Sequence, residues 1–378
     1  MKTATLLPQT LAIGIFLLLA DAPPASAQGV APTRPAAATN TTATTPAPAT
    51  APKSSKPATA AKFIKSNSID LVTYAKNLGF TATWTKTPDT TQLTLKKPGM
   101  KLDFTSEHID FYANGQRIFA GAPIHAYQNS LWISRIDADN LLTPIAAPAA
   151  IKSPIPALRV IAIDAGHGGK DKGTTNPRLK VDEKTFTLDT ANRLKTLLEQ
   201  KGYKVILTRL QDKQVDLGDR PDIAAKFKAD LLVSIHYNAI ENYSEAQTVT
   251  GVEVIRFTPR NQPPLFKRAN PGNEDRLPNP ADANGNWSAL AAFQVHRALL
   301  SNLKISDRGL KHDKLAVLRL ATMPAILVEP GFLTNDAEAK KIATAAYRQE
   351  IAKAIAAGIQ AYADTLALLR GQQQHSRQ

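Results

Sequence analysis

The sequence predicts an α/β fold with a mostly parallel or mixed central sheet flanked by helices on both faces, preceded by a small α+β domain. From residue 158 onward, apolar runs of strand length alternate with helical stretches, as expected when helices cover both faces of a sheet. Before this region the apolar runs are short and alternating. Asn114-Gly115 separates two of them, and this residue pair is typical of a type I′ hairpin turn.

The first 61 residues predict two segments outside the folded domains. Residues 1–27 carry Lys2, an apolar run over 11–20 and Ala25-Ser26-Ala27, the small-x-small pattern of a cleaved signal peptide. The apolar run has about half the length of a membrane span, which favours a signal peptide over an uncleaved anchor. Residues 28–61 are rich in Pro, Ala and Thr and lack acidic and aromatic side chains, so they predict a disordered linker.

The rest of the chain predicts two domains, a second linker and a tail. Residues 62–142 form the small α+β domain, in which a helix precedes several short strands. The Pro-rich residues 143–157 form the second linker, because four prolines lie among Ala and Ile. Residues 158–368 form the larger α/β domain, and residues 369–378 form a polar tail.

Within the larger domain the expected elements follow one another in a regular order. The expected strands are 158–163, 204–208, 231–235, 251–257, 315–318 and 325–328. The expected helices are 185–200, a short one around 223–227, 287–303, and closing helices over 336–368. The polar, Pro-rich segment 258–286 is too long for a routine connection and predicts a surface loop near the functional site.

Composition limits the chemistry that is open to this chain. It contains no cysteine, which excludes disulfides, cysteine zinc sites, iron–sulfur clusters and thiol nucleophiles, and leaves His and carboxylates as the strong metal ligands. The 46 Lys plus Arg against 32 Asp plus Glu give a net charge of +14, which favours anionic polymers as partners. The sequence has no zinc finger or basic stripe interleaved with aromatics, so nucleic acid is not expected as a partner.

Two histidines directly follow expected buried strands. His167 lies in Asp164-Ala165-Gly166-His167-Gly168-Gly169, and His236 lies in Ser234-Ile235-His236-Tyr237-Asn238. Strand ends in one open α/β sheet meet at the edge where such sheets bind ligands, so both imidazoles could converge there. Taken alone, each also fits a structural role: His167 as an exposed residue in a glycine turn, His236 as a hydrogen-bonded residue under a loop.

Two carboxylates complete a possible site. Glu183 lies in the first turn of the helix after the His167 strand, where an acidic residue also stabilises the helix dipole without any further role. Glu329 ends an apolar strand, where a carboxylate is costly unless it is paired, bound to metal or used as an acid or base; a cap on the following turn is the alternative. Two imidazoles supply half of a tetrahedral zinc site, which usually takes a third protein ligand and one water.

The larger domain carries an ordered set of motifs, which are residues 163–169, Glu183-Lys184, 202–209, 234–239, 251–254, 308–311, 317–319 and 323–335. Through these motifs, residues 158 to about 364 resemble the zinc-dependent N-acetylmuramoyl-L-alanine amidases of bacterial cell separation and wall turnover. Two departures from the family pattern are Pro330, where many relatives carry an aliphatic residue, and the 258–286 insertion, whose six prolines do not fit an autoinhibitory helix.

The resemblance implies a mechanism and a set of roles. It implies that His167, Glu183 and His236 ligate Zn²⁺, and that Glu329 is the catalytic carboxylate. The implied reaction cleaves the amide between the lactyl group of N-acetylmuramic acid and the L-alanine of the stem peptide in peptidoglycan. The chain is therefore expected to be exported, to act in the periplasm or the extracellular cell wall, to carry no stable membrane span after signal cleavage, and to use an activator protein in some settings.

Two other functions remain open at this point. One is a zinc carboxypeptidase or endopeptidase of wall peptides, and the other is a non-catalytic wall-binding protein. The stretch 111–118 followed by 131–134 resembles a hairpin module that precedes catalytic domains in several wall-associated and copper amine oxidase proteins. This second resemblance implies that residues 62–142 are an accessory domain, whose removal together with the linker leaves the chemistry on soluble fragments intact.

Overall fold

The computed structural model describes residues 66–265 and 270–375. The expected signal peptide, residues 1–27, and the expected linker, residues 28–61, lie outside the described residues. None of the helices in the two described ranges combines the length and the apolar composition that a membrane crossing needs.

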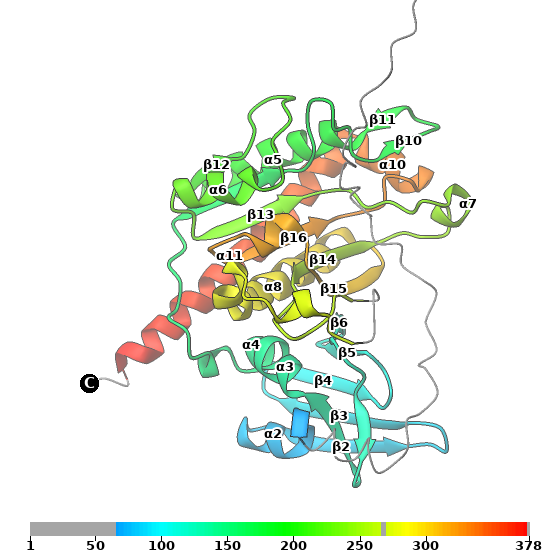
Figure 1. Ribbon diagram of the computed structural model, residues 1–378, viewed down its shortest axis with the longest axis vertical. Coiled ribbons are helices and arrows are strands. Elements are labelled where there is room, and N and C mark those ends of the chain that lie inside the picture. Colours follow the sequence, from blue (N-terminus) through cyan, green and yellow to red (C-terminus); the bar gives the residue numbers. More distant parts are fainter. Residues whose placement is uncertain (1–65, 266–269, 376–378) are drawn as a thin grey trace, which may run out of the picture. The chain divides into compact units, whose positions relative to one another are not determined.

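One mixed sheet of 11 strands organises the described chain (Figure 1). Its strands in chain order are β2 (Thr81–Lys86), β3 (Thr91–Lys97), β4 (Met100–Thr105), β5 (Asp110–Ala113), β6 (Gln116–Phe119), β9 (Val160–Ala165), β12 (Lys204–Leu207), β13 (Leu231–Ile235), β14 (Val252–Phe257), β15 (Asp307–Asp313) and β16 (Ala325–Glu329). Their order in the sheet is β12-β9-β13-β16-β14-β15-β6-β5-β4-β3-β2. Strands β12, β9, β13 and β16 are mutually parallel, so their carboxyl ends share one edge.

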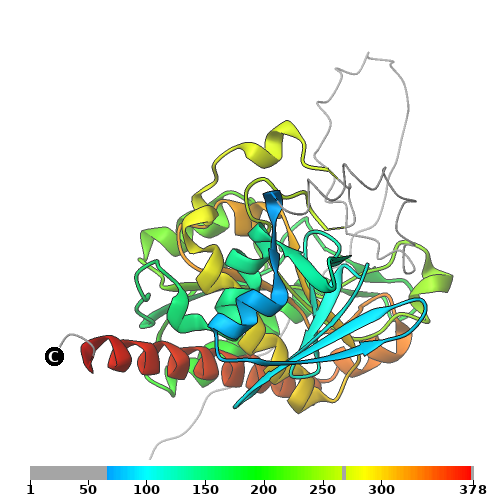
Figure 2. The same ribbon diagram turned by 90° about the horizontal axis from the view of Figure 1, so that it is seen from below.

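Helices cover both faces of the part of the sheet formed after residue 158, as the sequence predicts. On one face, buried side chains of α5 (Glu183–Glu199), α8 (Gly285–Leu303) and α11 (Ala345–His375) pack with β9 and β13 in the largest core. Figure 2 shows the long helix α11 in red. On the other face, α6 (Asp219–Lys226) and α9 (Ala316–Arg319) pack in a second core with Leu232 and Leu327. The expected fold class is therefore confirmed.

The strands of the small N-terminal region continue the same sheet. Strands β2 to β6 form an antiparallel meander, and β6 pairs in parallel with β15 through Leu310 and Ile118. Asn114 and Gly115, between β5 and β6, have φ values of 51° and 81°, which a type I′ turn requires. A separate sheet of β1 (Ser68–Asp70), β8 (Ser130–Ser134) and β7 (His125–Tyr127) accompanies helix α2 (Leu71–Asn77).

Short elements connect these layers. They are α3 (Arg135–Asp137), η1 (Ala138–Leu142), α4 (Thr143–Ala146), η2 (Pro148–Ala150), β10 (Thr175–Asn176), β11 (Val181–Asp182), α7 (Tyr243–Ala246), η3 (Asn273–Arg276), η4 (Pro280–Asn284) and α10 (Asp336–Ile342). The expected linker 143–157 thus begins with helix α4, in which Pro144 and Ile145 are buried, and α11 extends into the expected tail to His375. The domain boundaries themselves stay predictions.

One expected strand is wrong. Residues 315–318 were expected to form a strand, but the structure has helix α9 there, with Val317 and Leu318 buried against the second core. A run of four apolar residues does not distinguish a strand from a helical turn. The strand of this region is β15, with the sequence Asp-Arg-Gly-Leu-Lys-His-Asp. The sequence pattern does not predict a buried strand here, because the charges of this stretch are satisfied only by partners inside the folded protein.

The segment 258–286 is also placed differently from the expectation of a surface loop near the functional site. It follows β14, which runs antiparallel to β16, so it begins at the sheet edge opposite the carboxyl ends of β9, β13 and β16. Its first part is partly buried: the Leu265 amide donates to the His312 carbonyl, and Gln262 donates to Asp137 at 2.8 Å. The described part of this segment therefore contributes to the fold.

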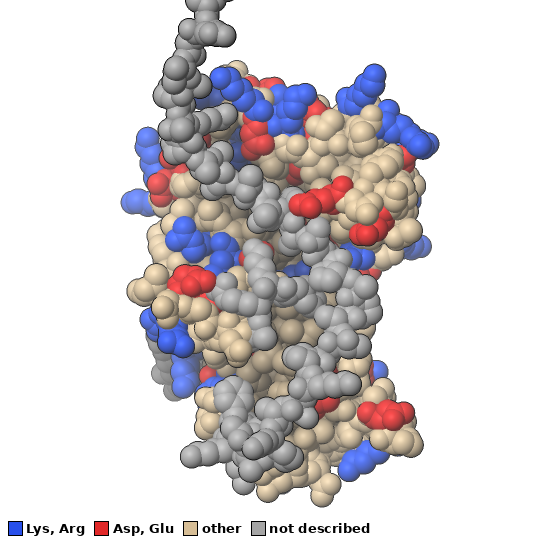
Figure 3. All heavy atoms as spheres, turned by 45° about the vertical axis from the view of Figure 1, so that its right-hand side comes forward, with Lys and Arg blue, Asp and Glu red and all other residues tan. Residues whose placement is uncertain are grey.

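Charged side chains are spread over the described surface. Figure 3 shows Lys and Arg at several places on one face, with Asp and Glu between them. Where grey atoms leave this face visible, the blue and red side chains are interspersed.

Candidate active site

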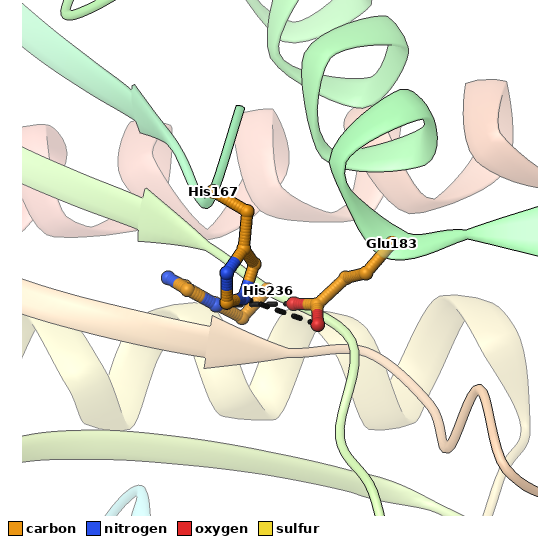
Figure 4. Close-up of side chains that lie close together, drawn as sticks. All are labelled: His167, Glu183 and His236. Carbon is orange, nitrogen blue, oxygen red and sulfur yellow. Dashed lines mark hydrogen bonds and ion pairs between the residues drawn. The ribbon is translucent and has the colours of Figure 1, made fainter. Parts of the chain in front are cut away.

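Three possible metal ligands converge at the carboxyl edge of the parallel strands (Figure 4). His167 follows β9, His236 follows β13, and Glu183 is the first residue of α5. Each offers one ligand atom, and these atoms lie within 4.8 Å of one another. The sequence analysis named all three residues, and the structure brings all three together.

Small residues make room for this cluster. His167 itself has a φ of 61°, a left-handed conformation that turns the chain sharply after β9. A Cβ added at Gly166 would lie 2.4 Å from Cε1 of His236, and one added at Gly173 would lie 2.5 Å from Cδ2 of His167. Glycine is therefore required at both positions because any side chain would displace an imidazole.

Buried arginines fix the turn that carries His167. Arg220 donates to the carbonyls of Ala165 (2.9 Å) and His167 (3.1 Å), and Arg209 donates to those of Ala165 (2.8 Å) and Gly166 (3.0 Å). Asp164, which is fully buried on β9, pairs with Arg220 at 2.7 Å. These bonds satisfy the backbone carbonyls of an irregular buried segment, so the two arginines fix the backbone position of His167.

Glu183 is the centre of the cluster. Its Oε1 lies 3.0 Å from Nδ1 of His236 and accepts from the Tyr237 amide, and its Oε2 lies 3.1 Å from Nε2 of His167 and accepts from the Thr174 amide. Burial alone raises the pKa of this carboxyl, but the hydrogen bonds and the charges of both histidines outweigh burial and hold its pKa far below the usual range. Glu183 is therefore an anion at any ordinary pH.

His167 has a second carboxylate partner that the sequence analysis missed. Its Nδ1 lies 2.9 Å from Asp171, which fixes the ring and leaves Nε2 directed at the cluster. Burial lowers the pKa of His167, but Glu183 and Asp171 together raise it to about 9. A carboxylate behind an imidazole is the usual outer partner of a metal-bound histidine, and the spacing of four residues within one loop was the available signal.

The donor set fits zinc. Two imidazoles and one carboxylate, with the carboxylate and one imidazole each held by a further hydrogen bond, match the three protein ligands of a catalytic zinc site. All three side chains are largely buried, yet His236 keeps 19% of its side chain exposed. The cluster can therefore hold a metal ion and still meet a substrate from solvent.

Glu329 lies beside this cluster. It ends β16, which pairs with β13 so that Ile235 faces Val328, and the His236 amide donates to the Val328 carbonyl at 3.0 Å. Its Oε2 is buried and has no hydrogen-bond partner among the described residues. Burial raises the pKa of Glu329 well above its usual value, and the negative charges of Glu183 and Glu253 raise it further. Such a group binds a proton more readily than an ordinary carboxylate, which suits it to accept and return one.

The turn after Glu329 is fixed by a buried carboxylate on α10. Glu338 accepts hydrogen bonds from the Phe332 amide (2.7 Å) and from the Gly251 amide (3.0 Å), so it joins this turn to the start of β14. Pro330, the departure noted above, directly follows the strand and leaves Glu329 paired within it. The sequence analysis missed Glu338 because a Glu in a first helical turn looks like an ordinary helix-stabilising residue.

Comparison with known proteins gives the family. The Amidase_3 model, described as N-acetylmuramoyl-L-alanine amidase, matches residues 161–361. The amidase AmiC of Neisseria meningitidis serogroup B is 33% identical over 229 residues, 56% of this chain and 54% of that protein. AmiC of Escherichia coli O6:H1 is 32% identical over the same length and with the same shares. The chain thus spans about half the length of these curated relatives.

Among solved structures, the N-acetylmuramoyl-L-alanine amidase of Clostridium difficile 630 is 34% identical. The match covers 55% of this chain and 97% of that one, with a TM-score of 0.45. The matched region of the family model contains His167, Glu183, His236 and Glu329. Because the model covers more than half of the sequence, the chain belongs to the N-acetylmuramoyl-L-alanine amidase family Amidase_3.

Proposed function

We propose that this protein is a zinc-dependent peptidoglycan hydrolase that cleaves the amide between the lactyl group of N-acetylmuramic acid and the L-alanine of the stem peptide. The observation that carries the proposal is the placement of a metal-type donor cluster, His167, Glu183 and His236, beside the buried carboxyl of Glu329. Family membership supports the choice of bond. A role in wall turnover or in the separation of daughter cells follows from that bond.

The three donors would hold the metal through Nε2 of His167, a carboxylate oxygen of Glu183 and a ring nitrogen of His236. Zinc bound there supplies a Lewis acid that lowers the pKa of a water molecule and polarises the scissile carbonyl. Asp171 keeps the His167 ring oriented, and the Thr174 and Tyr237 amides keep the Glu183 carboxylate in place. These bonds lower the cost of ordering the site when the metal binds.

Glu329 would move the proton. As a carboxylate it accepts a proton from the attacking water while the new C–O bond forms at the lactyl carbonyl. It then delivers that proton to the nitrogen of L-alanine as the C–N bond breaks, which gives a free carboxyl on the sugar and a free amine on the peptide. Its raised pKa suits both halves of this exchange.

The test is product analysis of purified peptidoglycan incubated with the full chain, before and after removal of metal by a chelator and again after zinc is restored. The expected products are intact stem peptides with a free L-alanine amine, formed only when metal is present. Metal-dependent cuts within the peptide would instead indicate a carboxypeptidase or endopeptidase. Bound zinc with peptidoglycan that stays unmodified even after a periplasmic or wall extract is added would indicate a wall-binding protein and would overturn the proposed activity.

We also propose that the protein is exported and acts in the periplasm or the cell wall. The signal-like residues 1–27 and the net charge of +14 support this location. An activator protein is part of the same proposal, and it is tested by comparing turnover of the purified chain with turnover in a periplasmic or wall extract. Equal rates in both would argue against an activator.

A further inference from the structure

A buried charged cluster lies behind Glu329, and the proposed chemistry does not use it. Glu253 on β14 pairs directly across the strands with Glu329. Lys311 on β15 lies 2.7 Å from Glu253 Oε1, and Nε of Arg308 lies 3.2 Å from the same oxygen. Glu253 and Lys311 are only 4% and 8% exposed. The cluster is therefore an interior one and not a surface ion pair.

The buried ion pair between Lys311 and Glu253 is not explained by stability alone. Removing two charges from water is unfavourable for each ion, and apolar residues at such positions are often as stabilising as the ion pair. Here the pair has a possible role, because Glu253 and Glu329 are neighbouring carboxylates that would otherwise repel each other or share a proton. Lys311 Nζ donates to Glu253 Oε1 at 2.7 Å, so the cation holds the Glu253 side chain in place beside Glu329.

The small N-terminal region covers this cation. Strand β6 lies beside β15, where the Arg117 amide donates to Asp307 at 2.7 Å. Next to it, Nζ of Lys311 lies 5.8 Å from the centre of the Phe119 ring, within the range of a cation–π contact. The same ring lies against Gly309, where an added Cβ would come within 2.6 Å of Phe119 Cε2. Phe119 thus forms part of the wall that keeps water from Lys311.

We propose that Lys311, covered by Phe119 of the N-terminal region, is a positioning residue that acts through Glu253 to hold Glu329 in its catalytic orientation. The inference rests on the proposed function and extends it, because it makes residues 66–142 part of the catalytic unit. It differs from the expectation that removal of residues 28–142 spares the chemistry on soluble fragments. Neither Lys311 nor Phe119 touches the substrate or the metal ligands in this scheme.

The test compares Lys311→Met with Lys204→Met in the full chain loaded with zinc. Lys204 is an exposed residue on the outermost strand β12 and serves as the matched control. Lys311→Met is expected to lower kcat about 10–100-fold, the range typical of residues that orient a reacting group, with KM and zinc content unchanged. Loss of the cation also raises the pKa of Glu329, so the acidic limb of the pH–rate profile moves to higher pH. Lys204→Met is expected to match the wild type.

Two further variants keep the proposal falsifiable if Lys311→Met folds poorly. Lys311→Arg retains the charge and is expected to recover most of kcat and the wild-type pH profile. Phe119→Leu is expected to lower kcat in the same direction, whereas Phe104→Leu, which alters the N-terminal core away from β15, leaves kcat unchanged.

The outcomes separate the two proposals. A wild-type chain that releases no stem peptides, either alone or with a periplasmic or wall extract, overturns the proposed function itself. An active wild type with unchanged kcat in Lys311→Met overturns the positioning role, as does a Lys311→Met protein that is folded but has lost its zinc. Equal losses in Phe119→Leu and Phe104→Leu would overturn the part assigned to Phe119, since the effect would then be one of general stability.

Discussion

The candidate site has a metal side, formed by His167, Glu183 and His236, and a carboxyl side, formed by Glu329. The two sides place the same residue type, glutamate, in opposite surroundings: Glu183 begins helix α5 and Glu329 ends strand β16. Glu183 has four hydrogen-bonding neighbours, and its pKa lies far below the usual range. Glu329 has a buried oxygen without a partner in the described chain, and its pKa is raised. The difference comes from the surrounding donors, because each of the two side chains has a buried carboxylate oxygen.

This contrast in pKa indicates different roles for Glu183 and Glu329. A carboxylate that is an anion at every ordinary pH is suited to hold a cation, since no proton competes for it. A carboxyl with a raised pKa is suited to exchange protons, since it binds a proton more readily than an ordinary carboxylate does. Pairs of titratable groups whose surroundings separate their pKa values are a usual sign of a division of roles, and the following predictions test that division.

The largest effect is expected on the metal side. His236→Ala removes one of the three donors, so both zinc content and turnover are expected to be lost completely. Metal analysis and release of stem peptides measure the two losses on the same sample. His375→Ala, an exposed histidine near the end of α11, serves as the control and is expected to keep both. Full zinc content in His236→Ala would remove it from the ligand set.

The next largest effect is expected at Glu329, and it separates the loss of turnover from the loss of zinc. Glu329→Gln keeps the shape of the side chain but cannot accept a proton, so turnover is expected to fall about 10²–10⁴-fold. Zinc content is expected to stay at the wild-type level because the donors are untouched. Steady-state kinetics together with metal analysis check this result. A variant that retains activity would show that another group moves the proton, and one that loses zinc would place Glu329 on the metal side.

A smaller effect on zinc affinity is expected from Asp171, the carboxylate that lies against His167. Asp171→Asn removes the charge that orients His167, so the dissociation constant for zinc is expected to rise about 10–100-fold. Competition with a chelating dye measures this change. Asp216→Asn, an exposed carboxylate in a nearby loop, is the matched control. Identical zinc affinities in the two variants would mean that Asp171 only stabilises its loop.

The last effect, which is the smallest when counted per pH unit, is a pH dependence on the metal side. In the metal-free protein His167 has a pKa raised to about 9, so a proton occupies the imidazole below that pH and must leave when zinc binds. Zinc affinity is therefore expected to rise with pH by up to about tenfold per unit and to level off above pH 9. Titrations with zinc in non-chelating buffers from pH 6 to 9 check the slope. A flat dependence would contradict the proton competition.

Much of the candidate site could be predicted from the sequence because each of its residues directly follows a clear local signal. His167 and His236 follow strands that are buried on both faces, and parallel strands bring their carboxyl ends together. Glu183 begins a helix with a strong apolar pattern. The local sequence around each of these residues predicts the strand or helix that carries it, and the order of those elements predicts where in the fold the residue lies.

The residues that sequence reasoning missed depend on contacts between distant segments. Glu338 joins residues 251 and 332, and Lys311 finds Glu253 across 58 positions. The strand β15 was missed for the same reason, because its charges are satisfied only after β14 and β6 are in place. Long-range pairing also explains why a continuous 11-stranded sheet was not expected from two regions that read as separate domains.

The pairing of β6 with β15 has a consequence for how this protein can be divided. A fragment that begins at residue 158 would lack β6, and β15 would become an open edge with unpaired amide and carbonyl groups. An open edge of this kind recruits strands from other copies, so the shortened protein would tend to self-associate. The N-terminal region therefore also covers a sheet edge that would otherwise be open to pairing with another chain.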